Sequence, residues 1–414
     1  MHISRKGPLG RWICVLILGM SSMACESDIL RPKINHSTFL KLYGGANDQT
    51  GIDLVQQTDG GFTLLGSTTS TDNPITGGMD RNLYWVQTDS LGDVLKSQIY
   101  HRSPEDHGKA MLKLPDGFLL LGEMISQNGL KNIWLIRSDL NGIPIWQKEL
   151  GKEAFDDVPE DMILDADNHI WIVGTTTDIN IHKQEGFTSD VDVSDIYLTR
   201  LDPQGNVLWE RRFGFEGLDE GKSLVALSDG RVAVLGHTDF PDPDPQELDL
   251  LFFLVDNSGI PVLSQRFGEE DQEERAVDLL AQEEGGLILV ANARRDSIRK
   301  PYVITLSDPN QQGVGQAHLL EVSGMVSGIA ELPSGGFVMS GSTAANADKD
   351  FLLLRVGADM QLQWTRTFGS AGNSFGGAIL APSDSAFVFV GTHAFGSNRM
   401  MSLIKTNQEG QLNP

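Results

Sequence analysis

Seven tight turns recur along this chain of 414 residues, and their spacing constrains the fold more than any other feature. The turns are rich in Gly, Asn and Asp, which tolerate the positive φ that two-residue hairpin turns require. Successive turns lie 49 to 62 residues apart, and each is followed by an apolar stretch. The turns are Gly60-Gly61, Asp116-Gly117, Asp167-Asn168, Asp229-Gly230, Gly285-Gly286, Gly335-Gly336 and Asp384-Ser385. This period predicts seven copies of one supersecondary unit.

Each copy carries the signals of four short strands. The apolar strand after the tight turn reaches a Gly in six copies, and Ala291 stands there in the fifth. A third apolar strand usually ends in an Asp-x-x-Gly turn, and a fourth carries Trp-x-x-x-aromatic-Gly, as in Trp209-x-x-x-Phe213-Gly214. The fourth strand is degenerate in the fifth copy, and Lys96 replaces the Trp in the first. Four antiparallel strands with a period near 50 residues are typical of a β-propeller blade.

We therefore expect an all-β fold, a seven-bladed β-propeller of four-stranded antiparallel blades, over residues 38–414. A β-solenoid is the alternative, disfavoured because its rungs are usually shorter and because these turns have hairpin character. The last copy has only three strands before the sequence ends. Phe39-x-x-x-Tyr43-Gly44 has the spacing of the fourth-strand motif. Residues 38–43 are therefore expected to close the ring as the outer strand of the last blade.

The N-terminus has the layout of a secretory signal. Three basic residues precede a short apolar run, Trp12–Met20, which is too short to cross a membrane. Ser22-Met23-Ala24 then precede Cys25, and a cysteine directly after a small residue resembles the cleavage point of bacterial lipoproteins. We expect residues 1–24 to be removed, Cys25 to carry the lipid, and residues 25–37 to form a short tether. An ordinary signal peptide followed by a chance cysteine is the alternative.

The cysteine count supports a lipidated Cys25, and the charge argues against nucleic acid as a partner. Cys14 would leave with the signal, so Cys25 would be the one cysteine of the mature chain, where lipid gives it a role. Glu26 follows it, rather than the Asp associated with inner-membrane retention, which favours the outer membrane. The chain has 56 Asp and Glu against 32 Lys and Arg, so nucleic acid is not an expected partner.

The tryptophan-containing repeat resembles those of propellers related to the quinoprotein (PQQ-type) and WD40-like superfamilies. Together with the N-terminus, it looks most like the propeller lipoproteins of uncharacterised function in Gram-negative bacteria. The resemblance covers the whole mature chain but lies at the level of the fold, which hosts many functions. It implies a cell-envelope propeller and no particular ligand.

Acidic residues gather in the loops that enter blades two to five and in those that join strands two and three. We expect these loops to share one face, where ligands are most often bound. The candidate binding residues are Asp106, Asp157, Asp190, Asp192, Asp195, Asp219, Asp242, Asp244 and Asp271. They would bind a cation or a basic partner.

A structural role competes with binding for part of this set. Asp48, Asp106, Asp157, Asp219 and Asp271 recur at what looks like one repeat position. For them the favoured interpretation is that they accept backbone N–H bonds within the loops. Asp190, Asp192 and Asp195 are a weak candidate for Ca²⁺, because they lack the Gly and Glu of an EF-hand loop. No other cofactor is expected.

The sequence lacks the His-Glu-x-x-His and Gly-x-Ser-x-Gly motifs. Trp146, Trp209 and Trp364 resemble sugar platforms in isolation, but their fixed repeat position favours packing between blades. We expect a non-enzymatic cell-envelope lipoprotein that binds a protein partner or a glycan on its loop-rich face, as an accessory subunit of an outer-membrane assembly. The alternative is a glycoside hydrolase or polysaccharide lyase that acts on an extracellular glycan through loop carboxylates.

Overall fold

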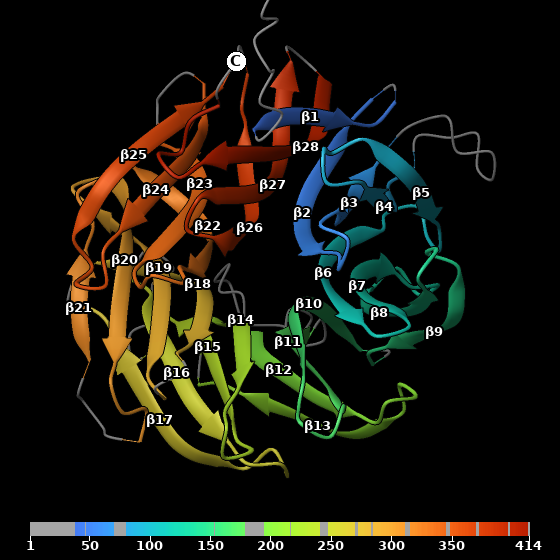
Figure 1. Cartoon of the computed structure of the whole chain (residues 1–414). Coiled ribbons are helices and arrows are strands. Elements are labelled where there is room, and N and C mark those ends of the chain that lie inside the picture. The colour runs from blue at the N-terminus through green and yellow to red at the C-terminus, as the bar shows by residue number, and fades with distance from the viewer. Residues whose placement is uncertain are drawn as a thin grey trace, which may run out of the picture. The chain divides into compact units, whose positions relative to one another are not determined.

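Seven four-stranded antiparallel sheets surround a common centre in the computed structural model (Figure 1). The structure describes residues 38–45, 47–69, 80–152, 154–178, 194–215, 217–240, 247–269, 272–282, 285–310, 315–344, 348–369, 372–395 and 398–412. The expected seven-bladed β-propeller is thereby confirmed. Within this described part of the chain, no helix is long and apolar enough to cross a membrane.

Blades one to six each consist of four consecutive strands, the first nearest the centre and the fourth at the outside (Figure 1). Blades one to three are β2 (Gln49–Gln56), β3 (Phe62–Thr68), β4 (Asn82–Thr88), β5 (Val94–Tyr100); β6 (His107–Leu114), β7 (Gly117–Ile125), β8 (Lys131–Asp139), β9 (Pro144–Leu150); and β10 (Phe155–Leu164), β11 (Ile170–Asp178), β12 (Ser194–Leu201), β13 (Val207–Phe213). Blades four to six are β14 (Asp219–Ala226), β15 (Val232–Thr238), β16 (Asp249–Val255), β17 (Pro261–Phe267); β18 (Glu273–Ala281), β19 (Leu287–Arg295), β20 (Ile298–Leu306), β21 (Gln316–Leu319); and β22 (Gly324–Glu331), β23 (Phe337–Thr343), β24 (Phe351–Val356), β25 (Leu362–Phe368). Blade seven is β26 (Phe375–Ser383), β27 (Ala386–Phe395), β28 (Asn398–Asn407) and β1 (Phe39–Tyr43).

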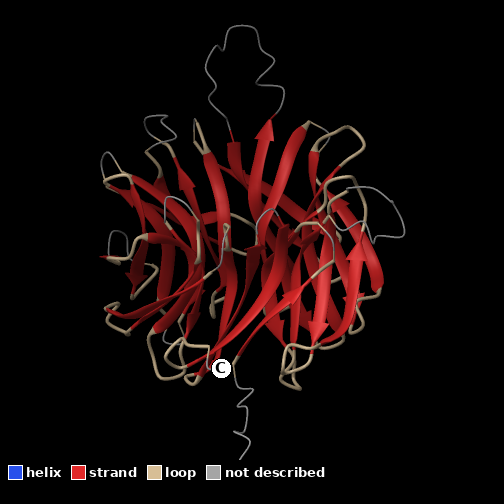
Figure 2. Cartoon of the chain, turned by 90° about the horizontal axis from the view of Figure 1, so that it is seen from above, coloured by secondary structure: helices blue, strands red, loops and turns tan. Residues whose placement is uncertain are grey.

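The loops fall on two faces of the ring, which Figure 2 shows from the side. The entry face holds the loops that lead into each blade and those between second and third strands. Two parallel bridges join such loops, Arg81 to Glu105 and Ser194 to Leu218. The turn face holds the first-to-second-strand hairpins, such as Gly60-Gly61, and the Asp-x-x-Gly turns.

The Asp-x-x-Gly turns also hold neighbouring blades together. Asp202 Oδ1 accepts the N–H groups of Gln204 and Asn206 at 2.9 and 2.8 Å, and Gly205 has a φ of 77°. A Cβ on Gly205 would lie 2.8 Å from the Trp146 ring of the preceding blade, so only Gly allows this approach. The same contact joins Trp209 to Gly259 and Trp364 to Gly410. The structure therefore places these tryptophans in the packing between blades.

The N-terminal strand closes the ring as expected. β1 pairs antiparallel with β28 and begins at Phe39, one residue later than predicted. Phe39 takes the place of a tryptophan against Gly92 of blade one, and the Tyr43 hydroxyl donates to the Gly92 carbonyl at 2.8 Å. Lys41 Nζ lies 2.7 Å from Asp93 of the same turn. β1 therefore joins blade seven to blade one.

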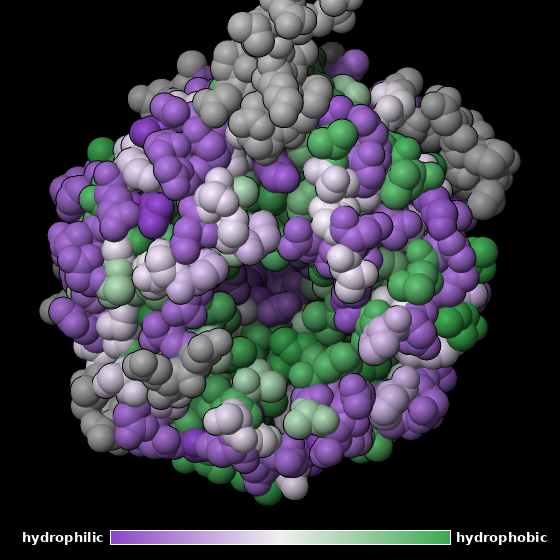
Figure 3. Space-filling model, in the orientation of Figure 1, coloured by the Kyte–Doolittle hydropathy of each residue, from purple (hydrophilic) through white to green (hydrophobic). Residues whose placement is uncertain are grey.

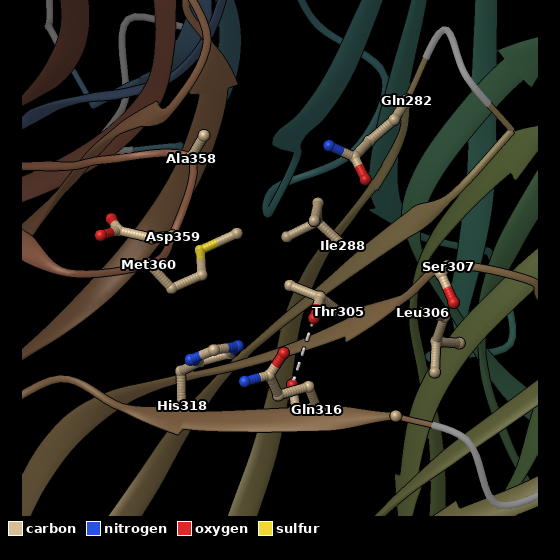
Figure 4. Close-up of a pocket in the computed structure, with 11 residues that line it drawn as sticks. Gln282, Ile288, Thr305, Leu306, Ser307, Gln316, His318, Ala358, Asp359 and Met360 are labelled. Carbon is tan, nitrogen blue, oxygen red and sulfur yellow. Dashed lines mark hydrogen bonds between the residues drawn. The ribbon is translucent and has the colours of Figure 1, made fainter.

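The degenerate fifth blade leaves a cavity on the turn face. Gln316 pairs with Thr305 where Trp209 pairs with Arg200, so it stands at the tryptophan position. In the next blade Met360, with a φ of 59°, occupies the usual Gly position of the turn. A cavity of about 520 Å³ opens here, and Figure 4 shows Gln316, His318 and Met360 around it.

Restoring the repeat at this place should stabilise the ring. The double change Gln316→Trp with Met360→Gly would fill the cavity with an indole ring and remove a non-Gly residue from positive φ. We expect a higher melting temperature than that of the wild type, measured by calorimetry. Gln316→Trp alone is the matched control and should stabilise less, because the Met360 side chain then competes for the space. A lower melting temperature for the double variant would contradict this account of the cavity.

The closing strand can be tested by removal. Deletion of residues 38–43 should leave β28 without its outer partner, and we expect aggregation or loss of the single cooperative unfolding transition. Tyr43→Phe is a milder change that removes one buried hydrogen bond and should lower the free energy of unfolding by about 1–3 kcal/mol. Urea unfolding followed by tryptophan fluorescence measures both. A deletion variant that melts like the wild type would rule out this closure.

Candidate functional site

The centre of the ring is a hollow, visible in Figure 3, whose wall is formed by the first strands of the blades. Each first strand contains a β-bulge, where an extra residue is inserted opposite the second strand. The inserted residues of blades one to six are Ile52, Lys109, Glu160, Lys222, Val277 and Ser327. The bulges therefore bring residues of very different chemistry to one level of the channel.

A chain of ion pairs crosses blades two to four at this level. Lys109 Nζ lies 3.6 Å from Glu123 and 3.5 Å from Glu160. Lys222 Nζ lies 3.2 Å from Glu160 and 2.9 Å from Glu220. Lys109, Glu160 and Lys222 thus each lie between two groups of opposite charge, and each of these bulge residues is tied to that of the next blade.

The chain ends at a buried histidine. His237 is 1% exposed, and its Nε2 lies 3.4 Å from Glu220. Burial lowers the pKa of His237, so the ring is neutral at pH 7. The contacts with His237 and then Lys222 hold the pKa of Glu220 well below its usual range. Burial by itself lowers the pKa of Lys222, but Glu160 and Glu220 outweigh it and the net shift is upward. The ionised pairs are therefore stable at neutral pH.

Three carboxylates from alternate blades lie one residue beyond the bulges. Asp53, Asp161 and Asp278 each accept a backbone N–H from the first strand of the following blade, at 2.6, 3.3 and 3.3 Å respectively; the donors are Met111, Leu224 and Ile329. The Ser223 hydroxyl lies 3.0 Å from Asp161 and 3.2 Å from Asp278. These carboxylates join blade one to two, three to four, and five to six.

Their position deep in the ring favours the protonated form. Burial raises the pKa of Asp53 and of Asp161 to about 7, and that of Asp278 to about 6. The charge of Asp278 raises the pKa of both others further. A serine hydroxyl has one proton to donate, so Ser223 can satisfy only one ionised carboxylate at a time. With pKa values of about 7, 7 and 6, the three carboxylates titrate close to neutral pH.

Three of the loop acids singled out from the sequence are buried at the entry face. The Asp106 carboxylate accepts the N–H of Arg102 at 2.7 Å, Asp157 that of Lys152 at 2.9 Å, and Asp219 that of Phe215 at 2.6 Å. All three residues are 0% exposed, and burial raises the pKa of each. They shape the entry loops, in agreement with the structural interpretation.

The strand register corrects two members of that recurring set. Gln49 faces Thr68 across blade one as Asp219 faces Thr238 across blade four. Glu274 holds the same position in blade five, where its carboxylate lies 2.5 Å from Arg295. The assignment of Asp48 and Asp271 to this position was therefore wrong, because Gln49 holds it in blade one and Glu274 in blade five. Asp48 instead accepts the N–H of Arg399 from blade seven at 3.0 Å.

Other sequence candidates are only partly described. Asp195 is the second residue of β12 and is half-buried; burial raises its pKa, and Arg212 opposes the shift. The remaining candidates lie outside the described residues: Cys25, Asp190, Asp192, Asp242, Asp244 and Asp271. Binding of Ca²⁺ by Asp190, Asp192 and Asp195 therefore stays a prediction.

One group in the described part of the chain brings three residues that could bind a metal together on the turn face. Asp165, Asp167 and His169 have ligand atoms within 4.8 Å of one another. Arg200 Nη2 already lies 2.7 Å from Asp165 and 3.1 Å from His169 Nδ1. A guanidinium thus takes the place that a metal ion would need, and the group is structural.

The comparisons with known proteins establish the fold alone. No protein-family model matches the chain, and no curated protein sequence matches it significantly. Among solved structures, an ulvan lyase (a polysaccharide lyase) superposes with a TM-score of 0.55 at 8% identity, covering 89% of this chain and 97% of that one. A protein of unknown function from Dyadobacter fermentans gives 0.51 at 8%, covering 89% and 98%. A puromycin hydrolase gives 0.53 at 11%, covering 85% of this chain and 52% of its own.

The channel carboxylates predict a pH dependence of stability. Because the pKa of Asp161 is higher in the folded state, its protonated form is favoured by folding, and stability falls as pH rises from about 4 to about 7. Asp161→Asn should flatten this decline, seen as a smaller drop of melting temperature between pH 4.5 and 7.5. Asp202→Asn is the control, because backbone N–H groups lower the pKa of this exposed carboxyl, and its removal should not flatten the decline. Equal slopes for wild type and Asp161→Asn would contradict the assignment.

Proposed function

We propose that the protein is a non-enzymatic cell-envelope lipoprotein whose entry face binds a protein partner or a glycan. The observation that carries the proposal is the continuous ion-pair chain from Glu123 to Glu220. A general acid or base must exchange a proton with a substrate. Here the lysines and glutamates at the level of the bulges are paired with one another and brace three blades. Such an arrangement supports a rigid binding surface.

The lipid anchor belongs to the same proposal. β1 enters the ring at the turn face, where Phe39 contacts the Gly92 turn. A tether over residues 25–37 would therefore reach the ring on that side, and 13 extended residues span at most about 45 Å. The entry face would remain available to a partner, in keeping with an accessory subunit of an outer-membrane assembly.

A glycoside hydrolase or polysaccharide lyase is the second candidate. The observation that favours it is the contact of Glu220 with both Lys222 and His237. A cation beside a neutral histidine is able to stabilise developing negative charge while the ring accepts a proton. Turnover of an extracellular glycan that is lost in Lys222→Met, with unchanged melting temperature, would establish this alternative.

The anchor is tested at Cys25. The wild-type protein should sediment with membranes and carry the mass of a lipid on its N-terminal peptide. Cys25→Ala should appear in the soluble fraction without that mass, because a buried acyl chain supplies the membrane affinity. Fractionation with mass spectrometry measures both. Full membrane retention of Cys25→Ala would overturn the lipoprotein part of the proposal.

The binding role is tested by purification of the full chain from solubilised envelope. A partner protein or a glycan that co-purifies reproducibly is the expected result. Recovery of neither, together with measurable turnover of a glycan, would overturn the non-enzymatic assignment in favour of the second candidate.

A further inference from the structure

A hollow between blades five and six on the entry face has a charge opposite to that of the protein. Its volume is about 460 Å³, and it is lined by Ser297, Ile298, Arg299, Ser323, Met325, Ala344 and Lys349. The lining holds two cations and no carboxylate, although acidic residues outnumber basic ones 56 to 32 in the whole chain. The sequence predicted acidic binding residues on the entry face, and the structure also contains a pocket with two basic residues on that face.

A rigid hairpin forms one side of this pocket. Asp296 and Ser297 have φ values of 51° and 66°, as in the two-residue turns that join strands tightly. The hairpin places Arg299 at the start of β20, and its Nη2 lies 2.9 Å and 3.1 Å from the two carboxylate oxygens of Glu273. A guanidinium has five N–H donors, so this contact orients Arg299 and leaves further donors for a ligand.

Lys349 forms the other side. Its ammonium lies 5.3 Å from the Phe375 ring, and no carboxylate of the described residues comes within 4.0 Å of it. The backbone around it is fixed, because its N–H donates to Asn373 at 3.0 Å and its carbonyl accepts from Ser374 at 2.6 Å. Lys349 is thus a half-buried cation, held in place and without an anionic partner in the described part of the chain.

We infer that this pocket binds the carboxylate or sulfate group of an acidic sugar, an inference that rests on the proposed binding role of the entry face. Arg299 and Lys349 supply charge-assisted donors for an anionic oxygen. The hydroxyls of Ser297 and Ser323 suit sugar hydroxyls, while Met325 offers an apolar surface to the C–H face of the ring. A volume of this size lies within the usual range for small-ligand pockets.

The binding is tested with the full chain by isothermal titration calorimetry. The probes are a pectin-derived oligogalacturonate, a chondroitin sulfate oligosaccharide, neutral maltohexaose and an oligoglutamate peptide. We expect heat with one or both acidic sugars, none with maltohexaose, and weaker binding at higher salt. The two acidic probes distinguish a carboxylate from a sulfate ligand.

Two variants locate the site. Lys349→Gln and Arg299→Gln should each weaken binding of the acidic sugar about tenfold or more, since each removes one charge-assisted contact. Both should fold, because Lys349 lacks an ion pair in the described structure and Glu273 keeps Arg294 at 3.1 Å. Lys131→Gln and Arg102→Gln, which remove cations from blade two and its entry loop, are matched controls and should change affinity less than twofold.

Each other outcome counts against the inference. Failure of both acidic sugars to bind, or equal binding by Lys349→Gln and the controls, would overturn it. Oligoglutamate that binds as tightly and with the same sensitivity to Lys349→Gln would overturn the assignment to a sugar. If Lys349→Gln still recovers an envelope partner after acidic sugars have failed, the proposed function stands while this inference falls.

Discussion

The ring depends on a contact that recurs between neighbouring blades, an outer-strand aromatic ring packed on a positive-φ Gly of the next turn. Trp146 meets Gly205 in this way, and Phe39 meets Gly92 where the two ends of the fold join. Gly is required because a Cβ would lie less than 3 Å from the ring. Among the described residues this contact joins blades two and three, three and four, six and seven, and seven and one, and the last of these forms only when β1 is in place.

Because these contacts lie at the outer strands, the residues of the inner strands can differ from blade to blade. A β-bulge in each first strand aims one residue at the channel and places the next between two blades. In blades two, three and four the residue inserted at the bulge is charged: Lys109, Glu160 and Lys222. In blades one, three and five the residue after the bulge is an aspartate: Asp53, Asp161 and Asp278. The channel chemistry therefore arises from positions that the ring itself does not need for closure.

The repeat and the closure were predictable because their residues have a local signature. Turn glycines and the aromatic-Gly spacing of Phe39 and Tyr43 are readable without any tertiary knowledge. The residues that face the channel could not be predicted from the sequence. A bulge shifts the register inside a strand, so the residues on its two sides no longer follow one alternation of period two. Entry loops of unequal length likewise hid that Glu274, and not Asp271, corresponds to Asp219. The acidic residues of the loops could be identified from the sequence. Whether each carboxylate faces solvent or binds the backbone of its own loop could not, because tertiary packing decides it.

The net negative charge of the chain is therefore a poor guide to what the entry face can hold. Asp106, Asp157 and Asp219 point into their own loops, and Glu160 and Glu220 are neutralised by lysines, whereas Lys349 keeps its charge without an anionic partner in the described structure. Distant charges are screened over about 8 Å at physiological ionic strength. A polyanion that reaches the pocket between blades five and six would meet Lys349 together with Arg299, whose charge Glu273 partly offsets. Long-range repulsion slows its approach, and the local donors determine its affinity.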